Sequence, residues 1–223
     1  MKIFEPEVNS PAGLDVLGTA IAAITKNQIH IGILFRGPDN HIKFLHLEWH
    51  HRLKCEPPRD NFLWLQSPLD EPNRDAIAAY CELVAEKGKN DQIPYGIDLD
   101  GSGFDPDTGK FDSSNEYAGL TCASFVIQIY RALRIPLVDL SNWPARKNDR
   151  NWQRSIIARL EESGRASSEH ISKQKDLLGR GVARFKPEEV ASAVAMKNPP
   201  HSRNDVRHNA DRLRNLAQAR LKL

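Results

Sequence analysis

Residues 117–133 read YAGLTCASFVIQIYRAL, and this stretch decides the fold that we expect. Beyond Thr121, apolar side chains recur at the spacing of one helix face, which predicts an amphipathic helix. Thr121 suits the N-cap position, so Cys122 would be the first helical residue. Unpaired backbone N–H groups and the positive end of the helix dipole favour a thiolate there and lower the pKa of the thiol. The pattern therefore predicts a reactive cysteine, although a cysteine considered alone is more often a small core residue.

Two upstream segments carry histidines at strand-like positions. Residues 28–35 read QIHIGILF and residues 43–50 read KFLHLEWH, and both alternate as strands do. The intervening residues 36–40 have the composition of a turn, which predicts an antiparallel hairpin. In such a hairpin His30 and His46 lie on neighbouring strands and can approach each other.

A thiol nucleophile requires an imidazole base and a polar group that fixes the tautomer of that base. We therefore predict Cys122, His30 and His46 as the catalytic residues. Glu48 and His50 follow His46 on the same strand face and are competing candidates for the third position.

These elements resemble the circularly permuted papain-like, or NlpC/P60-like, cysteine hydrolases and acyltransferases. The resemblance rests on the run HIGILF at 30–35, the next strand with His46 and the later Cys-x-x-Phe-Val helix, and it spans roughly residues 28–134. In that superfamily a general-base histidine opens a strand, a polar residue on the next strand orients it, and the nucleophilic cysteine starts a helix. In the permuted branch the histidine precedes the cysteine, as it does here. The resemblance implies an α+β fold with a papain-like core, in which helices pack on an antiparallel sheet.

The resemblance also implies hydrolysis of an amide bond through an acyl-enzyme intermediate. We expect a peptide, a protein or a peptidoglycan-like substrate and no cofactor, with Thr121 and Tyr95 at the substrate-binding site. Tyr95 belongs to a long glycine- and aspartate-rich connection, residues 88–116, and connections of this length are commonly functional. Ala123 and Ser124 replace the Glu-His pair of the better-known lipid-acting members, so amidase, peptidase and acyltransferase activities all stay open.

Two other functions compete with hydrolysis. A metal site could use the potential ligands that share one strand face, namely His46, Glu48 and His50. Such a site would leave the placement of Cys122 at a helix start unexplained. The second alternative is a catalytically inactive core whose basic C-terminal helices bind a partner.

Charge divides the chain of 223 residues, whose overall net charge is +2. Residues 1–140 carry a net charge of −7, whereas residues 141–223 carry +9. We therefore predict a catalytic core at 1–140 and a basic helical region at 141–223. Few aromatic residues accompany the basic side chains, so we do not expect a nucleic-acid-binding surface.

Hydrophobic periodicity predicts further elements along the chain. The predicted helices are residues 14–24, 75–87, 149–162, 167–178, 187–196 and 204–221. A short strand is predicted at 62–65, within a proline-rich segment, 51–72, that otherwise has the composition of a loop.

Cysteine usage and the N-terminus indicate where the protein works. Cys55, Cys81 and Cys122 form no pairing pattern, which is typical of a reducing compartment. The N-terminus has no secretory-signal pattern, and no apolar run reaches the ~20 residues of a membrane span. We expect a cytoplasmic protein without a membrane span, and the sequence is also compatible with export by a signal-less route.

Overall fold

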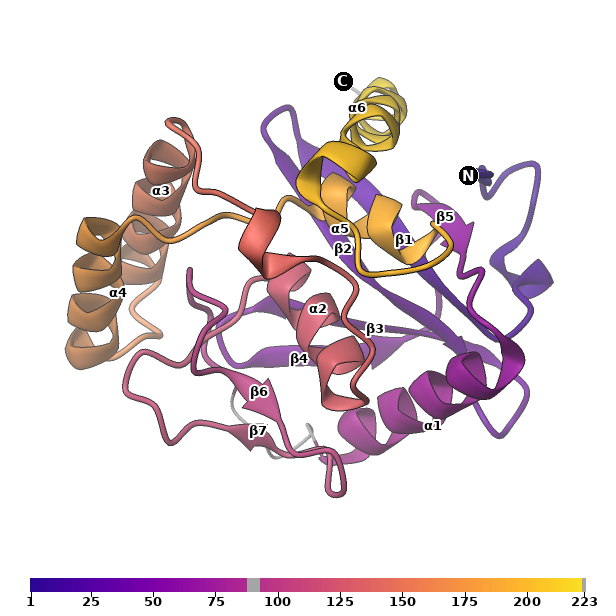
Figure 1. Ribbon diagram of the computed structural model, residues 1–223, viewed down its shortest axis with the longest axis horizontal. Coiled ribbons are helices and arrows are strands. Elements are labelled where there is room, and N and C mark those ends of the chain that lie inside the picture. The colour runs from indigo at the N-terminus through magenta and orange to yellow at the C-terminus, as the bar shows by residue number, and fades with distance from the viewer. Residues whose placement is uncertain (88–92, 222–223) are drawn as a thin grey trace.

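A five-stranded antiparallel sheet forms the centre of the fold (Figure 1). The computed structural model describes residues 1–87 and 93–221. The strands lie in the order β4-β3-β2-β1-β5, and each neighbouring pair is antiparallel. Their bounds are Leu17–Thr25 for β1, Gln28–Arg36 for β2, Ile42–Trp49 for β3, Arg52–Glu56 for β4 and Leu63–Gln66 for β5. The predicted α+β class with an antiparallel sheet is confirmed.

Helices cover the sheet and extend beyond one of its ends. In the described residues they are α1 Glu71–Lys87, α2 Cys122–Ala132, α3 Asp149–Glu162, α4 Ser168–Arg180, α5 Pro187–Val194 and α6 Arg203–Ala219. Figure 1 shows α2 and α5 in front of the sheet and α3 and α4 paired to one side. A small sheet of β6, Gly103–Phe104, and β7, Phe111–Asp112, lies in the connection before α2. None of these helices is both long and apolar enough to cross a membrane.

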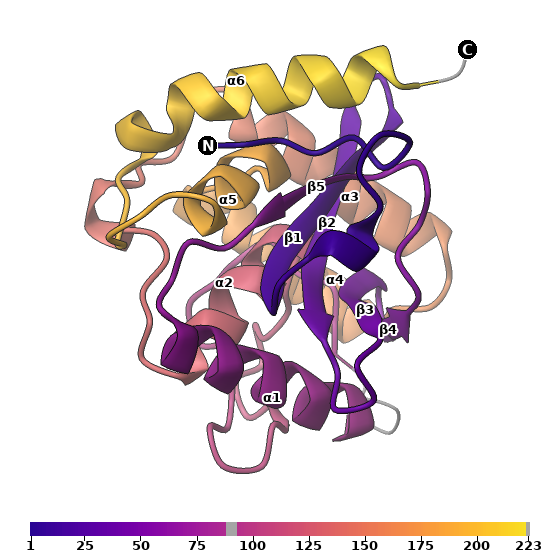
Figure 2. The same ribbon diagram turned by 90° about the vertical axis from the view of Figure 1, so that its right-hand side faces the viewer.

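Both faces of the sheet are buried. Helices α1, α2 and α5 pack on one face, where Ile21, Ile31 and Ile33 belong to the main core. The N-terminal segment covers the other face (Figure 2), where Phe4 stacks on Trp64 with ring centroids 4.1 Å apart. Because both faces are covered, β1 is buried from Leu17 to Ala23 without alternating with exposed residues.

The helix predicted at residues 14–24 is wrong, because Leu17–Thr25 forms strand β1. This strand pairs with β2 through a turn at Lys26 and Asn27, and with β5 on its other side. A short apolar run buried on both faces has no alternation, so its periodicity does not distinguish it from a buried helix. Pairing with two neighbouring strands, and not local preference, decides its conformation.

Strand β4 is missing from the sequence prediction, which assigns residues 51–72 to a loop apart from a strand at 62–65. The prediction at 62–65 is confirmed as β5, but β4 adds an edge strand that pairs only with β3. Edge strands commonly carry charged side chains, and β4 carries Arg52, Lys54 and Glu56. This composition hides the strand from an analysis based on hydrophobic pattern.

Helices of the basic region join the same core as the sheet. Val190 of α5 and Leu213 of α6 are buried in one cluster with Ile21 of β1. The five helices predicted at 75–87 and beyond correspond to α1 and α3–α6, with ends that differ by a few residues. The predicted boundary at residue 140 therefore separates regions of opposite charge but does not interrupt the hydrophobic core. The last two residues, 222–223, lie outside the described residues.

Two isoleucines of β1 distinguish the strand from the predicted helix. Ile21 is fully buried, whereas Ile24 is 46% exposed. We expect Ile21→Ala to lower the free energy of unfolding by about 2–5 kcal/mol, as truncation in a packed core does. Ile24→Ala should change it by less than about 0.5 kcal/mol. Urea denaturation of both variants measures this difference; equal losses would contradict the strand, since a helix would place both residues on one buried stripe.

Candidate active site

The pairing between β2 and β3 stops part-way along the strands. Residues 33–36 of β2 pair with residues 42–45 of β3, and the register includes no β3 partner for residues 28–32. Helix α2 packs on both strands. Where the strands diverge, the backbone N–H of Ile31 donates a hydrogen bond to Cys122 Sγ. Because β3 does not pair with this part of β2, the start of α2 can lie against Ile31.

Cys122 is the first residue of α2, as predicted. Thr121 is the N-cap, with extended backbone angles, and its hydroxyl accepts a hydrogen bond from the Ser124 N–H at 3.1 Å. The Ser124 hydroxyl in turn accepts a hydrogen bond from the Thr121 N–H at 2.8 Å. This reciprocal capping box fixes where the helix starts and directs the remaining N–H groups of its first turn towards the cysteine.

Tyr95 lies beside Cys122, as the sequence prediction for the site requires. The Leu120 N–H donates to the Pro94 carbonyl at 2.9 Å, which holds the Tyr95 segment against the start of α2. Gly96 and Gly119 permit this approach, because a Cβ on Gly96 would lie 2.7 Å from the Gly119 Cα. The Tyr95 hydroxyl then donates a hydrogen bond to Cys122 Sγ.

The thiol of Cys122 does not have the lowered pKa that its helix position predicts. Cys122 is only 6% exposed to solvent. Burial raises the pKa of Cys122 to about 11, and the hydrogen bonds from Ile31, Tyr95 and Ala123 oppose this rise without cancelling it. Loss of solvation for the thiolate therefore outweighs the helix start, and the sulfur is a neutral thiol at pH 7.

His30 and His46 form the hydrogen bond that the hairpin predicts. His30 Nε2 lies 2.8 Å from His46 Nδ1, and His46 Nε2 lies 3.2 Å from Glu56 Oε1. Glu56 is the diagonal neighbour of His46 across the β3–β4 pair, since Lys54 is directly opposite His46. Arg59 in turn donates a hydrogen bond from Nε to Glu56 at 2.7 Å. His30, His46, Glu56 and Arg59 thus form one hydrogen-bonded series.

The carboxylate of Glu56 assigns the tautomers of both histidines. Partial burial acts to raise the pKa of Glu56, but the hydrogen bond from Arg59 keeps it lowered, so the group is ionised and can only accept. His46 must then donate from Nε2 and accept at Nδ1, and His30 must donate from Nε2. The remaining nitrogen of His30, Nδ1, therefore carries a lone pair and is the basic atom.

Both imidazoles are neutral at physiological pH. Burial, followed by the neighbouring His46, lowers the pKa of His30 to about 3. Burial also lowers the pKa of His46 to about 4, although Glu56 opposes this effect. A neutral imidazole with a free lone pair is the form that a general base requires.

The other candidates for the third catalytic position have different partners, although Glu48 also lies 3.7 Å from Arg59. Glu48 forms ion pairs with Arg52 and Lys54 at 2.6 and 3.0 Å. His50 accepts a hydrogen bond from the Tyr95 N–H at 3.1 Å, beyond a register shift in β3. Sequence reasoning missed Glu56 and Arg59 because it assigned their segment to a loop.

Cys122 and His30 line the same small cavity, together with Thr121, Tyr95 and Glu48. The cavity holds about 20 Å³, which is little more than one water molecule. Side chains from the C-terminal region form its cover, namely Trp152, Ile156, Arg184, Phe185 and Pro187. Both candidate catalytic residues therefore contribute to the wall of one enclosed space.

The histidine-rich strand does not assemble a metal site. Among the described residues, no group of three or more His, Cys, Asp and Glu side chains could hold a metal ion. His46 is engaged by His30 and Glu56, whereas the ring of His50 packs on His51 at 3.9 Å, so the proposed ligands do not converge.

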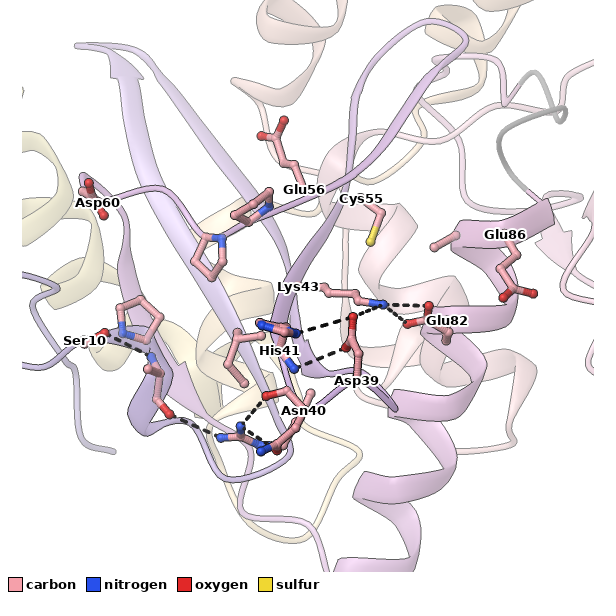
Figure 3. Close-up of a pocket in the computed structure, with 17 residues that line it drawn as sticks. Ser10, Asp39, Asn40, His41, Lys43, Cys55, Glu56, Asp60, Glu82 and Glu86 are labelled. Carbon is pink, nitrogen blue, oxygen red and sulfur yellow. Dashed lines mark hydrogen bonds and ion pairs between the residues drawn. The ribbon is translucent and has the colours of Figure 1, made fainter.

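A larger pocket, of about 650 Å³, lies beside the turn between β2 and β3 (Figure 3). It is lined by Cys55, Lys43 and Glu82, and Lys43 donates to Glu82 at 2.8 Å. Glu56 lines its rim, and Figure 3 shows the Glu56 carboxylate directed away from the Lys43–Glu82 pair. Neither Cys122 nor His30 reaches this pocket, so its size does not identify it as a reaction site.

Searches of the chain against protein-family models, curated proteins and solved structures found no match. The functional conclusions below therefore rest on the geometry of the site.

Gly32 provides the space for His46. A Cβ on Gly32 would lie 2.6 Å from His46 Cβ and 2.7 Å from the Leu45 carbonyl oxygen. We expect Gly32→Ala to lower the free energy of unfolding by about 1–3 kcal/mol, the usual cost of overpacking. Gly103→Ala is the matched control, because a Cβ there meets nothing within 4 Å. Urea denaturation compares the two; an unchanged stability of Gly32→Ala would contradict the close packing at His46.

Proposed function

We propose that the protein is a thiol hydrolase with a permuted papain-like core, which cleaves an amide bond of a peptide or peptidoglycan-like substrate. One observation carries the proposal: Cys122 at a helix start lines the same cavity as His30, and His30 is oriented by the His30–His46–Glu56 series. Cys122 is the nucleophile, His30 the base, and His46 the residue that orients His30.

The chemistry follows from these positions. His30 Nδ1 takes the proton of the Cys122 thiol, and the sulfur attacks the amide carbonyl carbon. Backbone N–H groups at the start of α2, including that of Cys122, can donate to the resulting oxyanion. The proton on His30 passes to the leaving amine as the C–N bond breaks, which leaves a thioester. Water, deprotonated by His30, then hydrolyses the thioester and restores the thiol.

Substrate binding has to open the site. The cavity is too small for a peptide, and both the thiol and the imidazole are neutral in this closed state. Displacement of the covering residues 184–187 would admit solvent and the substrate, and it would reduce the burial that raises the pKa of Cys122. In the closed state Cys122 is therefore kept as an unreactive, neutral thiol.

The lowered pKa of His30 predicts acid sensitivity. An unfolded chain binds a proton at this histidine near pH 6.5, whereas the folded chain binds it only near pH 3, so stability falls as the pH drops from about 6.5 towards 3. We expect His30→Gln to reduce this pH dependence between pH 7 and pH 4.5 by at most about 1.4 kcal/mol per pH unit. Urea denaturation at each pH measures it, with His208→Gln, which removes an exposed histidine, as the control. Identical slopes for wild type and His30→Gln would contradict the neutral, buried imidazole.

Labelling with a substrate-like electrophile tests the catalytic pair. A peptidyl chloromethyl ketone should open the site and alkylate Cys122 faster than the exposed Cys55, even though Cys122 is buried. His30→Ala should slow the labelling of Cys122 by about 100-fold or more, the usual contribution of a general base. His41→Ala, an exposed histidine next to the same hairpin, is the control and should have no effect. Labelling is read by mass spectrometry of each cysteine peptide.

The same experiment separates hydrolysis from a purely structural cysteine. If Cys122 reacts as slowly as the fully buried Cys81, and His30→Ala changes nothing, the proposal fails and the core is a catalytically inactive module.

A further inference from the structure

A second, strongly charged pocket adjoins the Cys122 cavity. It holds about 460 Å³ and lies between the β1–β2 turn, the segments that precede α3 and α5, and one face of α6. Five cationic side chains line it, namely Arg146, Lys147, Arg184, Lys186 and Arg214, against two carboxylates, Asp149 and Glu188. The walls therefore carry an excess of positive charge.

Only one of the cations is neutralised by close ion pairs. Arg146 bonds Asp149 at 2.9 Å and Glu189 at 2.5 Å. In the described part of the chain, Lys186 and Arg214 form no ion pair, and Arg184 stacks on Trp152 at 3.9 Å with its Nε buried and unpartnered. Glu188 and Glu189 act on Arg184 and Lys186 without a close ion pair, so these positive charges are only partly balanced.

The electrostatics of the walls agree with this excess. Burial, followed by the charge of Arg146, lowers the pKa of Lys186. Burial also raises the pKa of Glu188. An anion in the pocket would relieve the repulsion among the cations, and two guanidinium groups can bind a carboxylate through paired hydrogen bonds.

The pocket shares a wall with the candidate active site. Ile29 and Arg184 line both the charged pocket and the Cys122 cavity. The charge of Arg184 also acts on Cys122 and lowers its pKa against the larger effect of burial. A group bound to Arg184 would therefore lie one side chain away from the sulfur.

We propose that this pocket binds a carboxylate of the substrate, so that the preferred substrate is an acidic peptide or peptide-like amide with its carboxylate close to the scissile bond. This inference rests on the proposed hydrolase function. Asp149 and Glu188 in the same walls reduce the positive excess, which suits a carboxylate better than a phosphate dianion. The C-terminal region thus supplies substrate selection to the catalytic residues of the sheet and α2.

The ratio of two alkylation rates tests the charge preference without any turnover. Iodoacetate and iodoacetamide differ in one negative charge, so their rate ratio at Cys122 cancels the reactivity of the sulfur itself. We expect Lys186→Gln combined with Arg214→Gln to lower this ratio about tenfold, as the loss of two nearby charges should. Arg212→Gln, an exposed cation on another part of α6, is the matched control and should leave the ratio within about twofold of wild type. If the double variant does not fold, Arg214→Gln alone replaces it, and we expect a smaller decrease of the iodoacetate-to-iodoacetamide ratio.

Protection of Cys122 from iodoacetamide tests binding directly. N-acetylglutamate should slow the labelling of wild type but not of the double variant, and N-acetylglutamine at the same concentration should not protect. An unchanged alkylation ratio in the double variant, or equal protection by N-acetylglutamine, would overturn the proposal. Protection by inorganic phosphate alone would also overturn it and assign the pocket to phosphate.

The two proposals fail in different ways. If hydrolysis is wrong, His30→Ala leaves the labelling of Cys122 unchanged, while the alkylation ratio still depends on Lys186 and Arg214. If the carboxylate site is wrong, the ratio is insensitive to those residues, while the effect of His30→Ala persists.

Discussion

The incomplete pairing of β2 with β3 is the constraint on which the site depends. A fully paired hairpin would have no room for the start of α2 against Ile31. At Gly32 the two strands already lie close together, since a Cβ there would meet His46 Cβ at 2.6 Å. One break in a hydrogen-bonded ladder therefore creates the enclosed space that Cys122 and His30 share. The rest of the fold, with helices on one face and the N-terminal segment on the other, holds that break in place.

Desolvation and hydrogen bonding compete at this position, and desolvation decides the protonation states. The helix start and Tyr95 favour a thiolate at Cys122, but burial beneath the C-terminal segment removes the solvent that would stabilise the charge. Burial also keeps His30 uncharged, while Glu56 orders its tautomer through His46. The thiol and the two imidazoles of the resting site are consequently arranged by hydrogen bonds but uncharged.

Local patterns predicted those parts of the fold and site that depend on local chemistry. Turn residues at 36–40 and strand alternation located the β2–β3 hairpin and the contact between His30 and His46, and Thr121 located the start of α2. Strand β1 was not predicted because its conformation depends on pairing with β2 and β5. Glu56 escaped because its approach to His46 depends on the β3–β4 register. The raised pKa of Cys122 depends on side chains that follow residue 140, and no pattern around the cysteine contains that information.

Strand β4 combines two tasks that are usually separate. An exposed sheet edge offers unpaired backbone groups to the edges of other molecules, and charged side chains oppose such aggregation. In β4 these charges are Arg52, Lys54 and Glu56, and Glu56 also fixes the tautomer of His30, the proposed base, through His46. Selection for solubility and selection for catalysis would therefore act on the same carboxylate. Replacing it would expose the protein to self-association as well as to loss of function, so tolerance to mutation along this edge should be unusually low.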